Sequence, residues 1–452
     1  MAKHRPSRQM HLNVFLRNIG QHEAAWRLPE ARTEDVVNIV HYRHLAREAE
    51  RGKLDAIFLA DHPVLNARSQ DRPWDLLDPL ILVAALSGVT DHIGLVATGS
   101  TTYNDPYSLA RRYASLDHVS RGRAAWNVVT TVNREAAGNF GLPAHPDPDS
   151  RYARAEEFLE VVLGLWDSWD DDAIRADKSA GVFLDRSKVH RIDHAGDYFQ
   201  VAGPLEVPRS PQGRPVLFQA GSSGAGQRLA ARYADAIFTA QTRLEDAQHF
   251  YKGSKAQVAQ AGRDPAQVLV LPGISFFLGG TEAQARALQS SYENLILPSY
   301  GIAELLRITG EDFSGHDLDA TVRIPPRRSG QEHLHSRREL VQDLTDRETL
   351  TLRQLLRRLS AGRGHYPIVG TPEQVASELI RWYESGAADG FNLIPPSLPA
   401  SLTDFVDQVI PILQSRGIFR SDYGGATLRD HLGIDRPATR RQAVPSNDAT
   451  TV

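Results

Sequence analysis

A turn of glycine and serine, Gly221-Ser222-Ser223-Gly224, carries the strongest local chemical signal in this sequence. It follows a short apolar run at 216–219 and precedes a helical pattern at 226–233, so we expect it to open a helix. The first N–H groups of a helix lack partners and carry partial positive charge, and two hydroxyls beside them would complete a phosphate site. An ordinary loop with a serine cap is the alternative interpretation. The turn has neither the Lys-Ser/Thr pair of a Walker A loop nor the glycine order of a dinucleotide fold.

Asp61 and His62 follow another apolar run, at 56–59, and could act as an acid/base pair or as two metal ligands. A metal site would require further histidines and carboxylates at neighbouring strand ends, and the sequence offers none there. It also shows no His-Glu-x-x-His spacing and no Gly-x-Ser-x-Gly elbow. We therefore expect no metal, and we keep a metal-independent barrel hydrolase that uses Asp61 and His62 as one alternative.

The elements that must position these groups alternate between short apolar runs and segments with helical spacing. The strand candidates are 11–16, 56–59, 93–97, 123–129, 216–219, 236–239, 268–277 and 391–394. The helical segments are 34–51, 76–87, 106–119, 152–169, 226–233, 244–260, 372–385 and 402–416. Eight strands with intervening helices predict an α/β fold of the (β/α)8 TIM-barrel type. In such a barrel the chemistry lies at the carboxyl ends of the strands, which here are mostly small, hydroxylated or amide-bearing.

Two stretches do not follow the strand–helix repeat. Residues 170–213 are polar and then proline-rich, and residues 290–364 form a longer insertion. Long segments of this kind in a compact domain are often functional lids or binding loops, and we expect 290–364 to be a lid. The sequence thus predicts one barrel domain over 10–433 with these insertions, followed by an extended or disordered tail over 434–452.

Composition excludes several classes of function. The 452 residues include no cysteine, which removes disulfides, thiolate metal sites and a cysteine nucleophile. The 51 Lys and Arg against 55 Asp and Glu give a net charge of −4, which argues against a nucleic-acid-binding protein. No apolar run is long enough for a transmembrane helix, and the first residues do not form a secretory signal, so we expect no membrane association and a cytoplasmic location.

Several segments, taken together and in order, resemble the bacterial-luciferase-like flavin monooxygenases, and more narrowly the nitrilotriacetate / dibenzothiophene-sulfone monooxygenase branch. The resemblance covers roughly residues 10–433. The segments that carry it are Asn13-Val14-Phe15, Phe58-Leu59-Ala60-Asp61, Ser100-Thr101-Thr102-Tyr103, 120–131, Asn139-Phe140-Gly141, Arg151-Tyr152, Glu156-Glu157-Phe158, 219–223, 234–238, 390–393, 416–420 and Thr427-Leu428-Arg429.

The resemblance implies a two-component monooxygenase that uses reduced FMN (FMNH2) and O2, through a peroxide at flavin C4a, to oxygenate a small organic substrate. A separate NAD(P)H-dependent flavin reductase would supply the FMNH2 in a transient encounter, and the enzyme would be a homodimer or homotetramer. By position, Asp61 matches a flavin-contacting residue and Thr101 or Thr102 lies in a flavin-contacting loop. Tyr152 and Ser223, with Ser222 and Gly221, match the flavin-phosphate site.

The sequence departs from the family at Pro148, where a histidine usually stands four residues before the tyrosine; His145 is the candidate to replace it. Asn127, Thr130 and His11 are expected near the isoalloxazine or the substrate. No catalytic residue can be assigned, and the candidates are His11, Asn127 and His145.

Two further expectations follow. A deazaflavin-dependent oxidoreductase on the same barrel is the alternative to the flavin enzyme. The neutral strand ends favour a neutral or aromatic sulfur-containing substrate over an aminopolycarboxylate.

Overall fold

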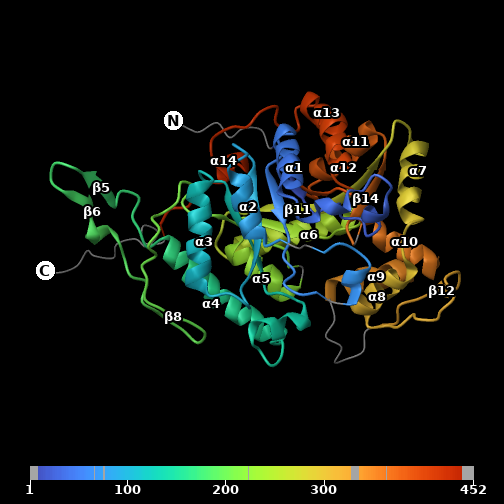
Figure 1. The fold of residues 1–452 in the computed structure, drawn as a ribbon, viewed down its shortest axis with the longest axis horizontal. Coiled ribbons are helices and arrows are strands. Elements are labelled where there is room, and N and C mark those ends of the chain that lie inside the picture. Colours follow the sequence, from blue (N-terminus) through green and yellow to red (C-terminus); the bar gives the residue numbers. More distant parts are fainter. Residues whose placement is uncertain are drawn as a thin grey trace.

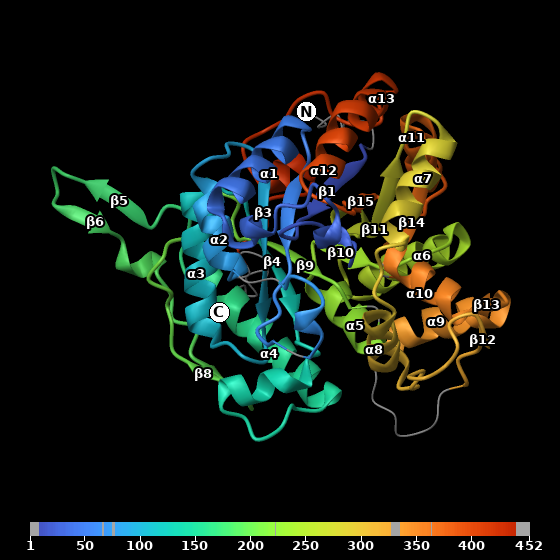
Figure 2. The same ribbon diagram turned by 45° about the vertical axis from the view of Figure 1, so that its right-hand side comes forward.

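Strands and helices alternate along the chain and close into a barrel (Figures 1 and 2). The computed structural model describes residues 9–65, 67–74, 77–221, 223–326, 335–362 and 364–439. Within them, eight parallel strands pair in the order β1-β2-β3-β4-β9-β10-β11-β15, and β15 pairs back to β1. Their bounds are His11–Phe15, Ala56–Leu59, Gly94–Ser100, Ala124–Val129, Val216–Gln219, Ala236–Thr239, Leu269–Leu278 and Gly390–Ile394. All eight predicted strands are present, and the TIM barrel is confirmed.

The interior of the barrel is filled by side chains that alternate along each strand. On β1, Leu12 and Val14 pack outward against the helices, so Phe15 and the other odd positions face inward. The ring of Phe58 contacts those of Phe15, Phe218 and Phe238, with centroids 5.3, 5.8 and 5.5 Å apart. This aromatic cluster packs inside the barrel near the carboxyl ends of its strands.

The helices that surround the barrel begin at strong capping residues. Asp105, Asp147 and Thr371 each cap a helix whose first residue is proline. The surrounding helices are α1 (Ile39–Arg51), α2 (Pro79–Ser87), α3 (Pro106–Val119), α4 (Pro148–Trp166), α5 (Gly224–Tyr233), α6 (Leu244–Gln260) and α11 (Pro372–Glu384). The predicted segment 402–416 is divided into α12 (Ala400–Asp404), a π-helical turn (Phe405–Val409) and α13 (Ile410–Ser415).

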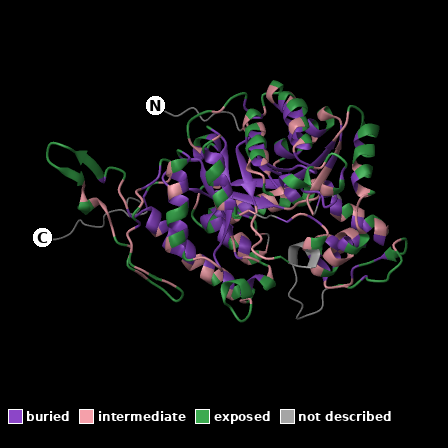
Figure 3. Cartoon of the chain, viewed as in Figure 1, coloured by how far each residue is buried: buried purple, intermediate pink, exposed green. Residues whose placement is uncertain are grey.

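The two irregular stretches fold differently from each other. Residues 170–213 form two exposed antiparallel ribbons, β5 (Ile174–Asp177) with β6 (Val182–Leu184) and β7 (His194–Ala195) with β8 (Gln200–Val201), and the first projects away from the barrel (Figures 1 and 3). The insertion 290–364 is largely helical and has a small apolar core of its own, which includes Leu305 and Leu352. Its elements are α8 (Pro298–Thr309), β12 (Thr321–Val322), α9 (His335–Arg347), β13 (Leu350–Thr351) and α10 (Leu352–Gly362), and its first residues form the end of α7 (Glu282–Glu293).

A ninth parallel strand, β14 (Tyr366–Gly370), was not predicted. It pairs with the outer half of the long strand β11, from Ile274 to Leu278, whereas the inner half of β11 pairs with β10 to close the barrel. The chain therefore returns from the insertion beside the barrel mouth, which places the residues just before β14 at that mouth.

The amino-terminal end of the barrel is closed by the C-terminal part of the chain. Leu428, on α14 (Leu428–His431), Leu432 and Ile434 join the interior apolar cluster, and Arg436 pairs with Asp171 at 2.7 Å. The part of the expected tail beyond residue 439 lies outside the described residues. Among the helices that the structure describes, none is long and apolar enough to cross a membrane.

Candidate functional site

The predicted phosphate residues meet at the carboxyl end of the barrel. Tyr152 lies on the first turn of α4, and Ser223 caps α5 by accepting a hydrogen bond from the Gly226 N–H at 3.2 Å. The hydroxyls of Tyr152 and Ser223 are 3.3 Å apart. Ser222, which was predicted to belong to the same site, lies outside the described residues. Two hydroxyls at the positive end of a ten-residue helix form a suitable cradle for an anion.

Two glycines at this turn, Gly221 and Gly226, are required by close packing. A Cβ on Gly221 would lie 2.9 Å from the Gly226 Cα, and a Cβ on Gly226 would lie 3.0 Å from the Tyr152 hydroxyl oxygen. The Gly221 N–H donates to Gln219 Oε1 at 2.8 Å, which holds the turn against the end of β9. A side chain at Gly226 would therefore crowd the Tyr152 hydroxyl, and one at Gly221 would crowd the first turn of α5.

Hydroxyl groups join the loops after β3 and β4. The Thr102 hydroxyl donates to the Thr130 carbonyl at 2.8 Å, and the Thr131 hydroxyl donates to Ser100 Oγ at 2.7 Å. Thr101 is fully buried and its N–H donates to the Val129 carbonyl at 2.9 Å. Thr101, Thr102 and Thr130 are thus brought together at the rim, where the hydroxyls of Thr101 and Thr102 donate to the carbonyls of Val129 and Thr130.

Arg151 is a buried charge that the sequence interpretation missed. Its guanidinium donates to the carbonyls of Thr130 at 3.2 Å, Thr131 at 2.6 Å and Pro146 at 3.1 Å. The segment Arg151-Tyr152 had been noted, but only the tyrosine was interpreted as part of the site. The rim expected to be neutral therefore carries a fixed positive charge beneath the loop after β4, and Arg154 adds a second by donating to the Thr101 carbonyl at 3.2 Å.

Asn127 faces the barrel interior at the end of β4. Its amide donates to Thr98 Oγ1 at 2.9 Å, and that hydroxyl donates to the Leu59 carbonyl at 2.7 Å. The Asn127 Oδ1 atom is buried and has no hydrogen-bond partner within the described part of the chain. Asp61 lies half-buried just after β2 on the same rim, and the neighbouring His62 ring contacts Trp74 with centroids 5.1 Å apart.

His145 contacts a tyrosine of the loop after β3 and not the predicted phosphate residues. Its Nδ1 lies 2.7 Å from the Tyr103 hydroxyl oxygen, and the Tyr103 ring stacks on Phe140. Burial, followed by the charge of Arg151, lowers the pKa of His145, and burial raises the pKa of Tyr103, so both are neutral at pH 7. His145 Nε2 is buried without a partner among the described residues. Pro148 occupies the first position of α4.

The structure does not bring His11 to this site. His11 begins β1 at the amino-terminal end of the barrel, and its Nδ1 lies 3.1 Å from Asp55 Oδ1. Asp55 also accepts a hydrogen bond from Arg420. Although burial opposes the shift, Arg420 and His11 lower the pKa of Asp55, so His11 belongs to a buried ionic network at the far end.

His365 is the mouth residue that the sequence gave no reason to select. Its ring stacks on Phe238 of the interior cluster, with centroids 5.3 Å apart and an interplanar angle of 6°. A Cβ on Gly273 would lie 2.3 Å from its Nδ1, so that glycine makes room for the imidazole. His365 could have been selected only if β14 had been predicted as a strand, because His365 immediately precedes it.

Comparison with known proteins gives a consistent result. The luciferase-like monooxygenase family matches residues 19–389. The chain is 47% identical to nitrilotriacetate monooxygenase component A of Aminobacter aminovorans, over 95% of this chain and 98% of that one. It is 46% identical to N-acetyl-S-(2-succino)cysteine monooxygenase of Bacillus subtilis (strain 168), over 96% and 98% of the two chains. It is 43% identical to dibenzothiophene-sulfone monooxygenase of Rhodococcus erythropolis (strain XP), over 96% and 99%.

Solved structures show the same similarity. The crystal structure of DmoA from Hyphomicrobium sulfonivorans superposes with a TM-score of 0.84 at 34% identity, covering 94% of this chain and 92% of that chain. EDTA monooxygenase from Chelativorans sp. BNC1 superposes with a TM-score of 0.81 at 37% identity, covering 95% and 99%.

Proposed function

Since this chain belongs to the luciferase-like monooxygenase family and is a flavin-dependent monooxygenase, we propose that its barrel mouth binds reduced FMN by the phosphate. The observation that carries the proposal is the contact between Tyr152 and Ser223, which come from different helices and meet at the N-terminus of α5. A phosphate there would accept hydrogen bonds from both hydroxyls and would benefit from the helix dipole.

The residues at the mouth fit the remainder of the coenzyme as well. Asn127 Oδ1 and His145 Nε2 are buried polar atoms without protein partners in the described residues, and a flavin ring offers both donors and acceptors. The aromatic cluster around Phe58 adds apolar ring surface near the carboxyl ends of the strands. We therefore propose Asp61, Thr101, Thr102, Asn127 and Thr130 as the residues that surround the ring.

Bound reduced FMN supplies the electrons that activate O2, so that one oxygen atom enters the substrate and the other becomes water. Tyr152 and Ser223 hold the phosphate, and Arg151 fixes the loop after β4 by its three carbonyl contacts. The neutral His145, held by Tyr103, would accept a proton on its ring and return it afterwards. The insertion 290–364 acts as a lid that keeps water from the mouth.

The supply of the coenzyme is part of the same proposal. A relative is named as component A of its monooxygenase, which supports a separate NAD(P)H-dependent flavin reductase as the source of reduced FMN. We propose a transient encounter with that reductase, O2 as co-substrate, a homodimer or homotetramer, and a cytoplasmic location.

The test is turnover under ¹⁸O2 with a generic FMN reductase and a panel of organic substrates. One ¹⁸O atom per product molecule is expected, together with NADH consumption that depends on the reductase. Product formation without O2 would contradict the proposal in favour of a hydrolase. Tighter anaerobic binding of a reduced deazaflavin than of reduced FMN would contradict it in favour of the deazaflavin enzyme.

A further inference from the structure

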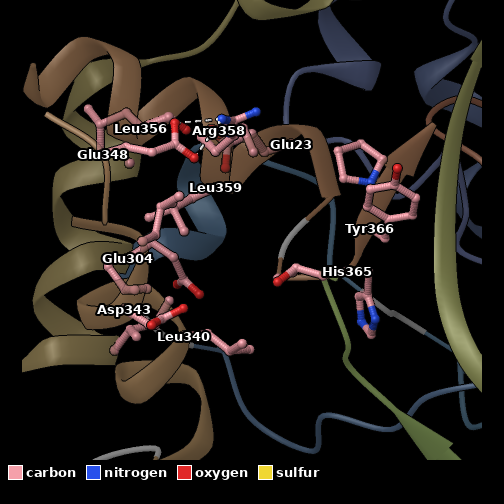
Figure 4. A pocket seen from close by; sticks show the side chains of 18 of the residues that line it. Glu23, Glu304, Leu340, Asp343, Glu348, Leu356, Arg358, Leu359, His365 and Tyr366 are labelled. Atoms are coloured by element: carbon pink, nitrogen blue, oxygen red, sulfur yellow. Dashed lines mark hydrogen bonds and ion pairs between the residues drawn. The ribbon is translucent and has the colours of Figure 1, made fainter. Parts of the chain in front are cut away.

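A cavity of about 440 Å³ lies between the helical insertion and the barrel (Figure 4). The insertion supplies one wall from α8, α9 and α10. The barrel supplies Thr242 and Arg243 directly after β10, Glu23 from the loop after β1, and residues 364–367 at the start of β14. Because β1 and β10 both end at the mouth, this side of the cavity is formed by the rim of the barrel.

His365 forms the wall of the cavity on the barrel side. Figure 4 shows His365 and Tyr366 on one side and the side chains of the insertion helices on the other. Since the imidazole also stacks on Phe238 of the interior cluster, one residue contacts both the cavity and the barrel mouth. A molecule bound in the cavity would therefore lie next to the mouth.

Apolar side chains of the insertion supply much of the lining. Ile308 comes from α8, Leu340 and Val341 from α9, and Leu356 and Leu359 from α10. The volume falls in the range of small-molecule pockets, which are mostly apolar with a few placed polar groups. An apolar molecule would gain free energy here by leaving water.

Charged residues of both signs surround this apolar lining. Four acidic residues line the cavity: Glu23, Glu304, Asp343 and Glu348. Glu348 pairs with Arg358 at 2.8 Å, and Asp343 pairs with Arg347 at 2.7 Å. Glu304 pairs with Arg307 on α8. Burial, followed by the nearby Asp246, raises the pKa of Asp343.

The three arginines of the lining all have acidic partners. Arg347 and Arg358 are matched by Asp343 and Glu348 of the cavity itself. Arg243 lies 3.6 Å from Glu245 and 4.0 Å from Asp246 at the start of α6. A bound polycarboxylate would face four carboxylates and would have to compete for every guanidinium, so its charges would be poorly compensated on leaving water.

We propose that this cavity is the substrate pocket of the monooxygenase and that it selects uncharged, largely apolar organic molecules against polycarboxylates. The proposal rests on the proposed function, because it assigns the substrate class of the same mouth. The proposed substrate class differs from that in the name of its relative, nitrilotriacetate monooxygenase component A, despite 47% identity to that protein.

The test measures binding of two probes, dibenzothiophene sulfone and nitrilotriacetate, by equilibrium dialysis with the full chain. The sulfone is expected to bind at least tenfold more tightly. Leu340→Trp fills the cavity from α9 and Thr242→Trp fills it from the barrel side, and each should weaken sulfone binding at least tenfold. Leu306→Trp is the matched control, because Leu306 is 41% exposed on α8 and does not line the cavity; it should change binding less than twofold.

Anaerobic titration with reduced FMN separates the two proposals. If the wild-type chain fails to bind reduced FMN, the proposed function fails, whatever the probes do. If reduced FMN binds but the sulfone does not, the substrate class is overturned. It is also overturned if nitrilotriacetate binds as tightly as the sulfone, or if both filling variants behave like Leu306→Trp. Thermal unfolding shows which of the two filling variants is folded. One folded variant is sufficient to test whether the sulfone binds in the cavity.

Discussion

At the scale of single residues, the site depends on hydroxyls whose partners come from distant parts of the chain. Tyr152 and Ser223 are 71 residues apart in sequence, and closure of the barrel places their oxygens 3.3 Å apart. Both could be selected from the sequence, because they occupy positions that match the flavin-phosphate site of the family. Arg151 and His365 could not, because their roles depend on carbonyls and rings supplied by other elements.

Tyr152→Phe removes one hydroxyl from the phosphate cradle and leaves the ring in place. We expect affinity for reduced FMN to fall about tenfold, corresponding to the loss of one hydrogen bond to a charged group, about 1.4 kcal/mol. Tyr233→Phe is the control, since the Tyr233 hydroxyl binds Glu160 near the other end of α5. Anaerobic fluorescence titration measures both, and equal losses in the two variants would contradict the assignment.

Arg151→Met keeps the length of the side chain but removes the donors that hold the loop after β4. The carbonyls of Thr130 and Thr131 lose a charged partner, so we expect a loss of about 2–3 kcal/mol in the free energy of unfolding. Urea denaturation measures this. A variant as stable as the wild type would show that the buried guanidinium does not organise the loop.

At the scale of elements, strand and helix patterns identified the barrel but not its irregular parts. The eight strands were recognisable because buried parallel strands are short apolar runs. β14 was missed because its exposure is mixed and it pairs only with the outer half of β11. The insertion 290–364 was expected to act as a lid, but its helices were not predicted from the sequence. Its apolar residues pack mainly on one another and not on the barrel, so they fall outside the strand–helix repeat.

Ser223 has two roles at the level of the element, because it caps α5 and lies in the phosphate cradle. Ser223→Ala should lose both, with about 1 kcal/mol of stability and about tenfold in affinity for reduced FMN. Ser223→Asp should keep the cap, because aspartate is a good capping residue, but its charge should repel the phosphate. Urea denaturation combined with flavin titration separates the roles. Flavin binding by Ser223→Asp at the wild-type level would place the phosphate elsewhere.

At the scale of the whole molecule, the two ends of the barrel have different tasks. The carboxyl end carries the hydroxyl-rich site, whereas the amino end holds the buried network of His11, Asp55 and Arg420. His11 was named as a site candidate after the family resemblance, although it is the first residue of the strand predicted at 11–16. The direction of that strand places it at the amino end of the barrel, away from the carboxyl ends where the site forms. We expect the free energy of unfolding to depend on pH through the buried histidines at the amino end of the barrel.

Burial, followed by the charge of Arg420, lowers the pKa of His431 to about 4 in the folded chain. The unfolded chain binds the proton near pH 6.5, so the contribution to stability is complete above that value. It is lost as the pH falls towards 4, by up to about 3 kcal/mol. His431→Gln should therefore lose less stability than the wild type between pH 7 and pH 5 in urea denaturation. Parallel losses would contradict the assignment.

The central claim is that the barrel mouth recognises the phosphate of a reduced flavin through Tyr152 and Ser223. The most direct measurement is an anaerobic titration of the wild type and of the double variant Tyr152→Phe/Ser223→Ala with reduced FMN and with reduced riboflavin, which lacks the phosphate. The account predicts that the wild type prefers FMN by at least about 100-fold, equivalent to two hydrogen bonds to a charged group, and that the double variant loses most of this preference. Equal affinities of the wild type for the two flavins would contradict it.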